Sequence, residues 1–197
     1  QFCQWFPKER STRIRNMALF IMGLYMSGHP HLSKIVRKWP LAGKLISSTN
    51  RLWRFLNNSR SDVEHWYAPV AQEIMRHLPT GPITLVVDTT KVGFYHRVLT
   101  IGVAFKKRTL PLVWSVRRGR KGHTKVDEQL ALFKKVAKIL PKSADIWVVG
   151  DTEFQSVRLL RWFSRRHWHF VIRQQGKNKV RWKGQSWIKI NALNDLS

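Results

Sequence analysis

The acidic side chains of this chain are few, and two of them occupy positions suited to metal chemistry. Only 11 Asp and Glu residues occur among 197. Asp88 comes directly after the apolar run 85–87, and Asp151 directly after the run 147–150. Each run predicts a short buried strand, and ligands bind at the carboxyl ends of strands in sheets with parallel strands. If the two strands are neighbours, the carboxylates converge although 63 positions separate them in sequence.

Two converging carboxylates in a strongly basic chain predict a site for Mg²⁺ or Mn²⁺. Mg²⁺ prefers hard oxygen ligands and usually takes one or two protein carboxylates, with phosphate and water as its other ligands. Two such ions about 3.5–4 Å apart can activate the attacking oxygen and stabilise the leaving oxygen in phosphodiester displacement. A structural alternative stands beside this reading, because an Asp at a strand end followed by Thr is also typical of a turn or helix cap. The paired placement of Asp88 and Asp151 favours the metal site.

The charge of the chain indicates a polyanionic partner. Lys and Arg total 36 against 11 acids, for a net charge of +25, which attracts DNA, RNA or an anionic membrane surface. The best apolar run, residues 17–26, is too short to span a bilayer, and no signal peptide is readable. The single Cys3 excludes an internal disulfide framework and a Cys-rich zinc site. We therefore expect nucleic acid as the partner, no membrane, and a cytoplasmic, nucleoid-associated location.

The first part of the chain, residues 1–78, has helical periodicity. Apolar residues between Ile14 and Tyr25 recur at helical spacing. Ser47 or Ser48 is a candidate cap for a short helix that buries Leu52, Phe55 and Leu56 and ends near Asn57 and Asn58. A third helix is expected to follow the cap Asp62, with a kink or division at Pro69.

Beyond the linker at 79–82 the periodicity changes to that of strands. Residues 83–87, 98–105 and 112–116 predict three strands joined by short connections. Thr124, with Asp127 as its capping-box partner, predicts the start of a helix that buries residues up to Leu140. A strand at 146–149, a helix at 157–166 and a strand at 170–172 follow. The order βββαβαβ is the layout of an α/β, ribonuclease H-like core with a mixed sheet and flanking helices.

Basic residues in three segments are candidates for DNA contacts. A face of the first short helix carries Arg51, Arg54 and Asn58; a glycine-flanked loop after the third strand carries Arg117, Arg118, Arg120 and Lys121; the helix after Asp151 carries Arg161 and Arg165. Each could instead be part of a solvated basic face, but as a set they favour phosphate binding. Of the ten Trp residues most are expected in the core, including Trp53, Trp66 and Trp147.

The two Asp motifs resemble a known family. Asp88 in LVVDTTKV and Asp151 in VVGDTEF are similar to the first two carboxylates of DDE transposases of the bacterial insertion-sequence type, and RLWRFLNN at 51–58 resembles their upstream segment. In that type a β-strand insertion separates the second Asp from the final Glu. The resemblance implies metal-dependent cleavage and strand transfer at transposon ends. It also implies double-stranded transposon-end and target DNA as partners, and a homo-oligomeric synaptic assembly.

The resemblance suggests three parts: a helical DNA-binding segment at 1–78, a partial catalytic core at 79–174 and the start of the β-strand insertion at 175–197. The family's third carboxylate follows a Tyr, two residues, Arg, three residues, Glu pattern. The three Tyr residues all precede Asp151, so the pattern is absent. We expect the chain to stop inside the insertion and to be inactive or impaired alone. Glu153 could substitute as a ligand, but its position favours a supporting role beside Asp151.

Two other functions fit the same residues. A ribonuclease H-like nuclease or resolvase would use the same Asp pair without joining strands. A non-catalytic nucleic-acid-binding remnant of a transposase would explain the missing third carboxylate.

Overall fold

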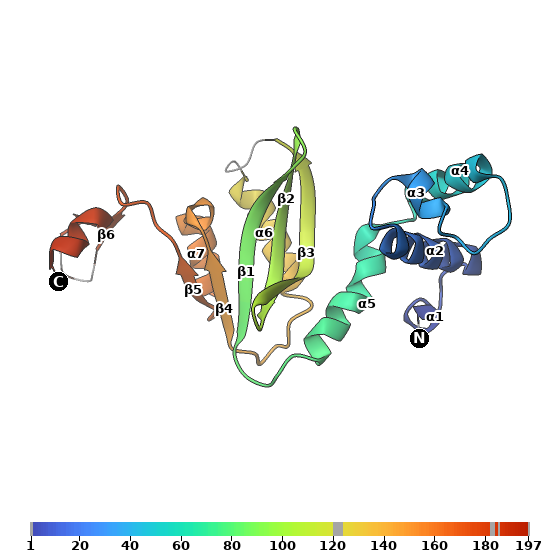
Figure 1. Ribbon diagram of the computed structural model, residues 1–197. Coiled ribbons are helices and arrows are strands. Elements are labelled where there is room, and N and C mark those ends of the chain that lie inside the picture. The colour runs from blue at the N-terminus through green and yellow to red at the C-terminus, as the bar shows by residue number, and fades with distance from the viewer. Residues whose placement is uncertain (1, 120–123, 182–183, 185, 197) are drawn as a thin grey trace. The chain divides into compact units, whose positions relative to one another are not determined.

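The computed structural model describes residues 2–119, 124–181, 184 and 186–196 (Figure 1). The chain forms two compact units, Gln1–Pro69 and Val70–Ser197, each described here by itself. The division falls within helix α5 (Val63–Arg76), whereas the sequence places the boundary at the linker 79–82. Among the described residues, no helix has the length and apolar character needed to cross a bilayer.

The N-terminal unit is helical, as its periodicity predicts. Its helices before α5 are α1 (Phe2–Trp5), α2 (Ser11–Ser27), α3 (Leu32–Val36) and α4 (Leu45–Leu56). They enclose one apolar core, made of Phe6, Leu19, Ile35, Val36, Trp39, Leu52, Phe55 and Trp66. Gly23 of α2 lies against α3 so closely that a Cβ on it would come 2.6 Å from the carbonyl oxygen of Ile35. The unit therefore depends on a backbone-to-backbone approach that only glycine allows.

One predicted helix cap is wrong and another is confirmed. Helix α4 begins at Leu45, so Ser47 and Ser48 lie inside its first turn and neither caps it. Asp62 does cap α5, because its Oδ2 accepts a hydrogen bond from the backbone N–H of His65 at 2.9 Å. Pro69 does not divide α5, which runs continuously from Val63 to Arg76.

The expected burial of tryptophan is correct for Trp66 and wrong for two others. Trp66 is 7% exposed, whereas Trp53 is 56% and Trp147 is 37% exposed. Trp53 follows the buried Leu52 by one position, which rotates its side chain about 100° around the helix and away from the core. Trp147 lies between buried residues of a strand, where successive side chains point to opposite faces. Size and apolarity favoured burial, but the periodicity of each element decides it.

The C-terminal unit contains a five-stranded mixed sheet with the order β3-β2-β1-β4-β5 (Figure 1). Its strands are β1 (Ile83–Val92), β2 (His96–Phe105), β3 (Arg108–Arg118), β4 (Ile146–Gly150) and β5 (His169–Ile172). The first three strands pair antiparallel, and β4 pairs parallel with both β1 and β5. The predicted order βββαβαβ and the α/β class are confirmed.

Two helices, α6 (Val126–Val136) and α7 (Val157–Ser164), connect into the parallel strands and share one core. The ring of Phe133 from α6 packs edge-on against Phe163 from α7 with centroids 4.7 Å apart. Alternate residues of β1 and β4 are buried on this side, while Trp147 and Val149 on the opposite side are partly exposed. The expected inward positions from Leu130 to Leu140 are all buried.

Several predicted boundaries change. The third strand, β3, runs from Arg108 to Arg118 and not from 112 to 116, because its pairing with β2 extends over that whole range. Strand β1 continues to Val92 instead of ending at residue 87, because its antiparallel pairing with β2 extends to Val92 and His96. Helix α6 begins at Val126 with Lys125 as an N-cap that makes no side-chain bond, so the predicted Thr124–Asp127 capping box is wrong. Helix α7 ends at Ser164, two residues earlier than expected.

The expected β element of the tail is present in short form. Strands β6 (Lys179–Val180) and β7 (Ile188–Lys189) pair antiparallel, and the 3₁₀ helix η2 (Ile190–Leu196) follows. The side chain of Asn178 donates to Gln155 at 2.7 Å and so links this element to the segment after β4.

The close approach at Gly23 leads to a stability prediction. We expect Gly23→Ala to lower the free energy of unfolding by about 1–2 kcal/mol, because overpacking against α3 outweighs the higher helix propensity of alanine. Chemical denaturation followed by tryptophan fluorescence measures this change. The matched control is Met26→Ala in the same helix, where Met26 is 57% exposed and a change within about 0.5 kcal/mol is expected. A Gly23→Ala chain as stable as the parent would show that the helices are not packed this closely.

Candidate active site

The parallel register of β1 and β4 brings Asp88 and Asp151 to the same level of the sheet. Paired residues run from Ile83 with Ile146 to Val87 with Gly150, and every pair is separated by 63 positions. Asp88 and Asp151 have the same separation and are the next residue on each side. Because neighbouring strands lie about 4.8 Å apart, the two backbones are adjacent at this level. Asp88 was predicted at the end of its own strand, and this is wrong because β1 continues to Val92. Asp88 instead lies at the level where the parallel partner β4 ends.

The two carboxylates also lie on the same face of the sheet. Val87 and Thr89 are buried on the helix-covered side, so the exposed Asp88 between them points to the opposite side. A Cβ on Gly150 would lie 2.8 Å from Val87 Cγ1 and 3.0 Å from Phe154, which places that position on the helix-covered side. Asp151 has an extended backbone and is exposed on the other face. The structure therefore brings the two predicted residues together.

Each carboxylate uses one oxygen for a local hydrogen bond. Thr90 Oγ1 donates to Asp88 Oδ2 at 3.1 Å, and the backbone N–H of Glu153 donates to Asp151 Oδ1 at 2.9 Å. Asp151 thereby caps the 3₁₀ helix η1 (Thr152–Phe154), which is the structural role considered above. Within the part of the chain that the structure describes, the second oxygens of Asp88 and Asp151 accept no hydrogen bond. Capping by Asp151 thus leaves one of its oxygens available to a ligand.

This donor set fits a hard divalent cation. Two exposed carboxylates with unused oxygens match the one or two protein ligands that Mg²⁺ commonly takes, the remainder being water and phosphate. In the described ranges no group of three or more His, Cys, Asp and Glu side chains is placed to hold a metal ion. Asp88 and Asp151 could hold such a cation as a pair, with water and phosphate as the remaining ligands.

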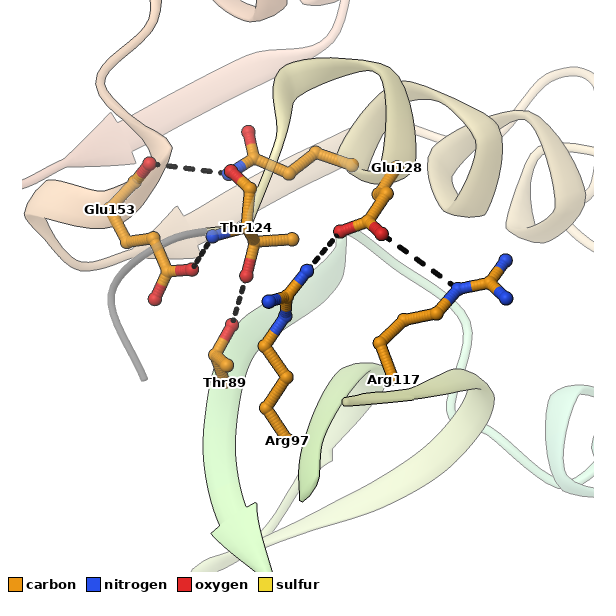
Figure 2. Close-up of polar contacts among 7 residues, drawn as sticks. Thr89, Arg97, Arg117, Thr124, Glu128 and Glu153 are labelled. Carbon is orange, nitrogen blue, oxygen red and sulfur yellow. Dashed lines mark hydrogen bonds and ion pairs between the residues drawn. The ribbon is translucent and has the colours of Figure 1, made fainter. Parts of the chain in front are cut away.

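A largely buried polar network lies on the helix-covered side of the sheet, next to both carboxylates in sequence (Figure 2). The hydroxyls of Thr89 and Thr124 are hydrogen-bonded at 3.2 Å, and the backbone N–H of Thr124 donates to Glu153 Oε1 at 3.0 Å. Gln129 is fully buried and donates its amide to the carbonyl oxygens of Thr124 and Glu153, both at 3.3 Å. The network connects three segments to one another: the residue after Asp88, the segment before α6 and the turn after Asp151. The Glu153 side chain contacts Thr124, and its backbone N–H donates to Asp151 Oδ1.

A second cluster joins β2 and β3 to α6 (Figure 2). Arg97 is 8% exposed, and its Nη2 lies 2.7 Å from Glu128 Oε2. Arg117 Nε lies 3.8 Å from the other oxygen of Glu128. A Cβ on Gly119, whose φ is +145°, would lie 2.3 Å from Arg97 Nη1, so this position requires glycine. Sequence reasoning missed the cluster because a buried Arg within a strand has no periodic signal of its own.

The candidate DNA contacts of the N-terminal unit are not one helix face. Arg51 donates from Nε to Asn16 Oδ1 at 2.8 Å and lies over the ring of Trp39. Arg54 is exposed, with a long 3.4 Å bond to the Asn50 carbonyl oxygen. Helix α4 ends at Leu56, so Asn58 lies beyond it and binds the backbone N–H of Arg60 instead. The predicted alignment of Arg51, Arg54 and Asn58 is therefore wrong, because the helix ends two residues before Asn58.

The candidate DNA contacts of the C-terminal unit are placed in part. Arg117 and Arg118 were expected in a loop, but they are exposed residues at the end of β3. Arg120 and Lys121 lie outside the described residues. Arg161 is exposed on α7, and Arg165 is an exposed residue directly after its last residue.

Comparison with known proteins adds no family assignment: neither the protein-family models nor the curated proteins contain a match to this chain.

The two acidic residues in the first turn of α6 lead to a paired prediction. Glu128→Ala leaves the charge of Arg97, whose side chain is 10% exposed, without its nearest counter-charge. We expect it to lower the free energy of unfolding by about 3 kcal/mol. Denaturant titration followed by far-ultraviolet circular dichroism measures the loss.

Asp127→Ala is the matched control. Asp127 precedes Glu128 and is also ion-paired, with Arg158 at 2.7 Å, but both side chains are more than half exposed. An exposed pair contributes about 0–1 kcal/mol. Equal losses in the two variants would mean that the Arg97–Glu128 pair is as solvated as the surface pair.

Proposed function

We propose that this chain is part of a metal-dependent DNA transposase that cleaves and joins strands at transposon ends. The observation that carries the proposal is the shared register and shared face of Asp88 and Asp151. A pair of carboxylates at adjoining positions is a ligand set that Mg²⁺ commonly uses together with substrate phosphate. The proposal includes Mg²⁺ or Mn²⁺ as the cofactor.

The sheet supports the ribonuclease H-like part of the proposal. Three antiparallel strands continue through β1 into the parallel strands β4 and β5, with α6 and α7 as connections. This is the arrangement that the proposed core needs, because it places the carboxyl end of β4 beside the middle of a longer β1. Ligands in open α/β sheets bind outside the carboxyl ends of the strands where the strand order reverses, and here the chain crosses from β3 to β4 on the other side of β1.

The chain's own residues have distinct roles under this proposal. Asp88 and Asp151 would hold the cation, which when bound activates the oxygen that attacks the phosphodiester and stabilises the leaving oxygen. Glu153, Thr124 and Thr89 hold the turn after β4 against β1 and so fix the direction of the Asp151 carboxylate. They are positioning residues, since none of them contacts the reacting phosphate in this scheme.

Charge supports DNA as the substrate. A net charge of +25 gives strong, salt-dependent attraction to phosphate backbones without sequence information. Arg117, Arg118, Arg161 and Arg165 are exposed in the same unit as the carboxylates. Transposon-end and target duplexes are the substrates that the family resemblance implies, in a synaptic assembly of two or more copies.

One observation favours a second candidate, a nucleic-acid-binding protein without catalysis. The candidate site holds two carboxylates, and no third His, Cys, Asp or Glu of the described residues joins them. A nuclease that cuts without strand transfer would use the same pair, and detection of a joined product separates it from a transposase.

Metal titration tests the proposal. We expect Mn²⁺ to bind the parent chain and to bind Asp88→Ala or Asp151→Ala at least about tenfold more weakly, because each substitution removes half of the protein ligands. Electron paramagnetic resonance of free Mn²⁺ measures binding directly and does not require turnover.

The control for this titration is Asp145→Ala. Asp145 precedes β4 at its other end, where it contacts Trp147 Nε1 and His169. It should leave Mn²⁺ binding unchanged. If Asp88→Ala and Asp145→Ala bind Mn²⁺ as the parent does, the Asp pair is structural and the enzyme proposal fails.

A further inference from the structure

The turn between β1 and β2 exposes two aromatic rings. Phe94 is 88% and Tyr95 is 70% exposed, and they are the last two residues of the three-residue turn 93–95 that lies at the top of Figure 1. Apolar rings at a loop tip lose favourable burial energy, and exposed apolar groups of this size commonly mark a contact surface. Neither ring belongs to the core or to the carboxylate site.

The backbone that carries these rings is well held. Strand pairing continues up to Val92 with His96, immediately before and after the turn. Gly93 has a φ of +59°, which closes the turn, and the backbone N–H of Gly119 donates to the carbonyl oxygen of Tyr95 at 3.0 Å. Three strands thus support the tip, so a ligand that binds the rings does not have to order the loop first.

The geometry of the rings leaves their faces accessible to planar ligands. Their centroids are 6.4 Å apart and their planes are inclined at 54°, so they are not stacked on each other. Unpaired nucleobases stack on such aromatic side chains without regard to sequence, since every base has a π face.

The surroundings of the tip are cationic. Residues 89–98 contain no acid. Lys91, His96 and Arg118 are exposed beside the turn, His96 and Arg118 as a directly paired couple of β2 and β3. Aromatic rings between cations are the combination that binds single-stranded nucleic acid, with the cations on the backbone and the rings on the bases.

The tip lies a short distance along β1 from the carboxylate pair. Four residue steps separate Asp88 from Val92, which at about 3.3 Å per residue is about 13 Å. Both features belong to one hairpin, with Asp88 in the middle of β1 and the turn directly after the end of β1.

We propose that Phe94 and Tyr95 stack on unpaired bases of the DNA strand whose phosphate lies at the Asp88–Asp151 site. This inference rests on the proposed function for its position, because the carboxylate pair defines where the scissile phosphate lies. It adds a surface for locally unpaired DNA, with Lys91, His96 and Arg118 on the adjoining phosphates.

The test uses a synthetic duplex with a single-stranded extension that carries 2-aminopurine, whose fluorescence is quenched by stacking. The parent chain is expected to quench the probe. Phe94→Ala/Tyr95→Ala should abolish quenching and weaken binding to the extended probe about tenfold or more, since an aromatic stack is lost. Affinity for the blunt duplex should change less than about threefold, because phosphate contacts remain.

Two control variants sharpen the result. Tyr25→Ala removes a ring that is 89% exposed in the N-terminal unit and should leave quenching intact. Phe94→Trp/Tyr95→Trp keeps aromatic faces at the tip and should retain quenching, whereas Phe94→Leu/Tyr95→Leu keeps apolar size and should lose it.

Three outcomes would overturn the inference. The first is unchanged quenching in the alanine variant, and the second is an equal loss of affinity for extended and blunt DNA. The third is a variant that binds both DNA probes as the parent does but binds vesicles of phosphatidylserine and phosphatidylcholine more weakly. The last would identify the tip as a membrane contact. The assay contains no metal, so the two proposals can fail separately. A parent chain that binds Mn²⁺ but does not quench the probe would refute this inference alone, and a parent chain that quenches the probe but does not bind Mn²⁺ would refute the metal site alone.

Discussion

The parallel pairing of β1 with β4 is the interaction on which the rest of this protein's site depends. Leu85 and Val87 of β1, with Ile146 and Val148 of β4, bury their side chains on the helix-covered face. A slip of β4 by one residue against β1 would turn Ile146 and Val148 to the opposite face, so burial fixes the register. The same register sets Asp88 beside Asp151 on the opposite face. The position of the chemistry is thus a consequence of the apolar core.

Two features keep the end of this pairing in place. Gly150 allows Val87, Phe154 and Ile172 to pack where any side chain would intrude. The hydrogen bonds among Thr89, Thr124 and Glu153 then connect the turn after β4 to β1 through buried groups. A buried network of this kind is costly when one member is lost, because its partners remain desolvated. The arrangement suits a site whose ligands must be held at fixed positions.

Sequence reasoning succeeded where a feature follows from a local pattern. The apolar runs before Asp88 and Asp151 predicted the two strands. The structure then pairs these strands with a separation of 63 positions, which is also the separation of Asp88 from Asp151. Asp62 was recognised as a helix cap from its position before an apolar helix.

It failed where tertiary contacts decide. Thr124 looked like a cap, but its hydroxyl binds Thr89 and the helix begins two residues later. Asn58 seemed to extend a basic helix face, but α4 ends at Leu56. The buried Arg97 with its partner Glu128, and the exposed Phe94 and Tyr95, are contrary to the usual burial of their residue types. Such exceptions have no signature in a single sequence.

The most direct test of the account is whether positions 88 and 151 can share one cation. Replacing both residues with cysteine, in a chain with Cys3→Ser, creates two thiolates that bind Cd²⁺ and give a ligand-to-metal absorption band in the ultraviolet. The account predicts that Asp88→Cys/Asp151→Cys binds one Cd²⁺ per chain on the order of a hundredfold more tightly than either single variant. A double variant that binds Cd²⁺ no more tightly than the single variants would contradict it.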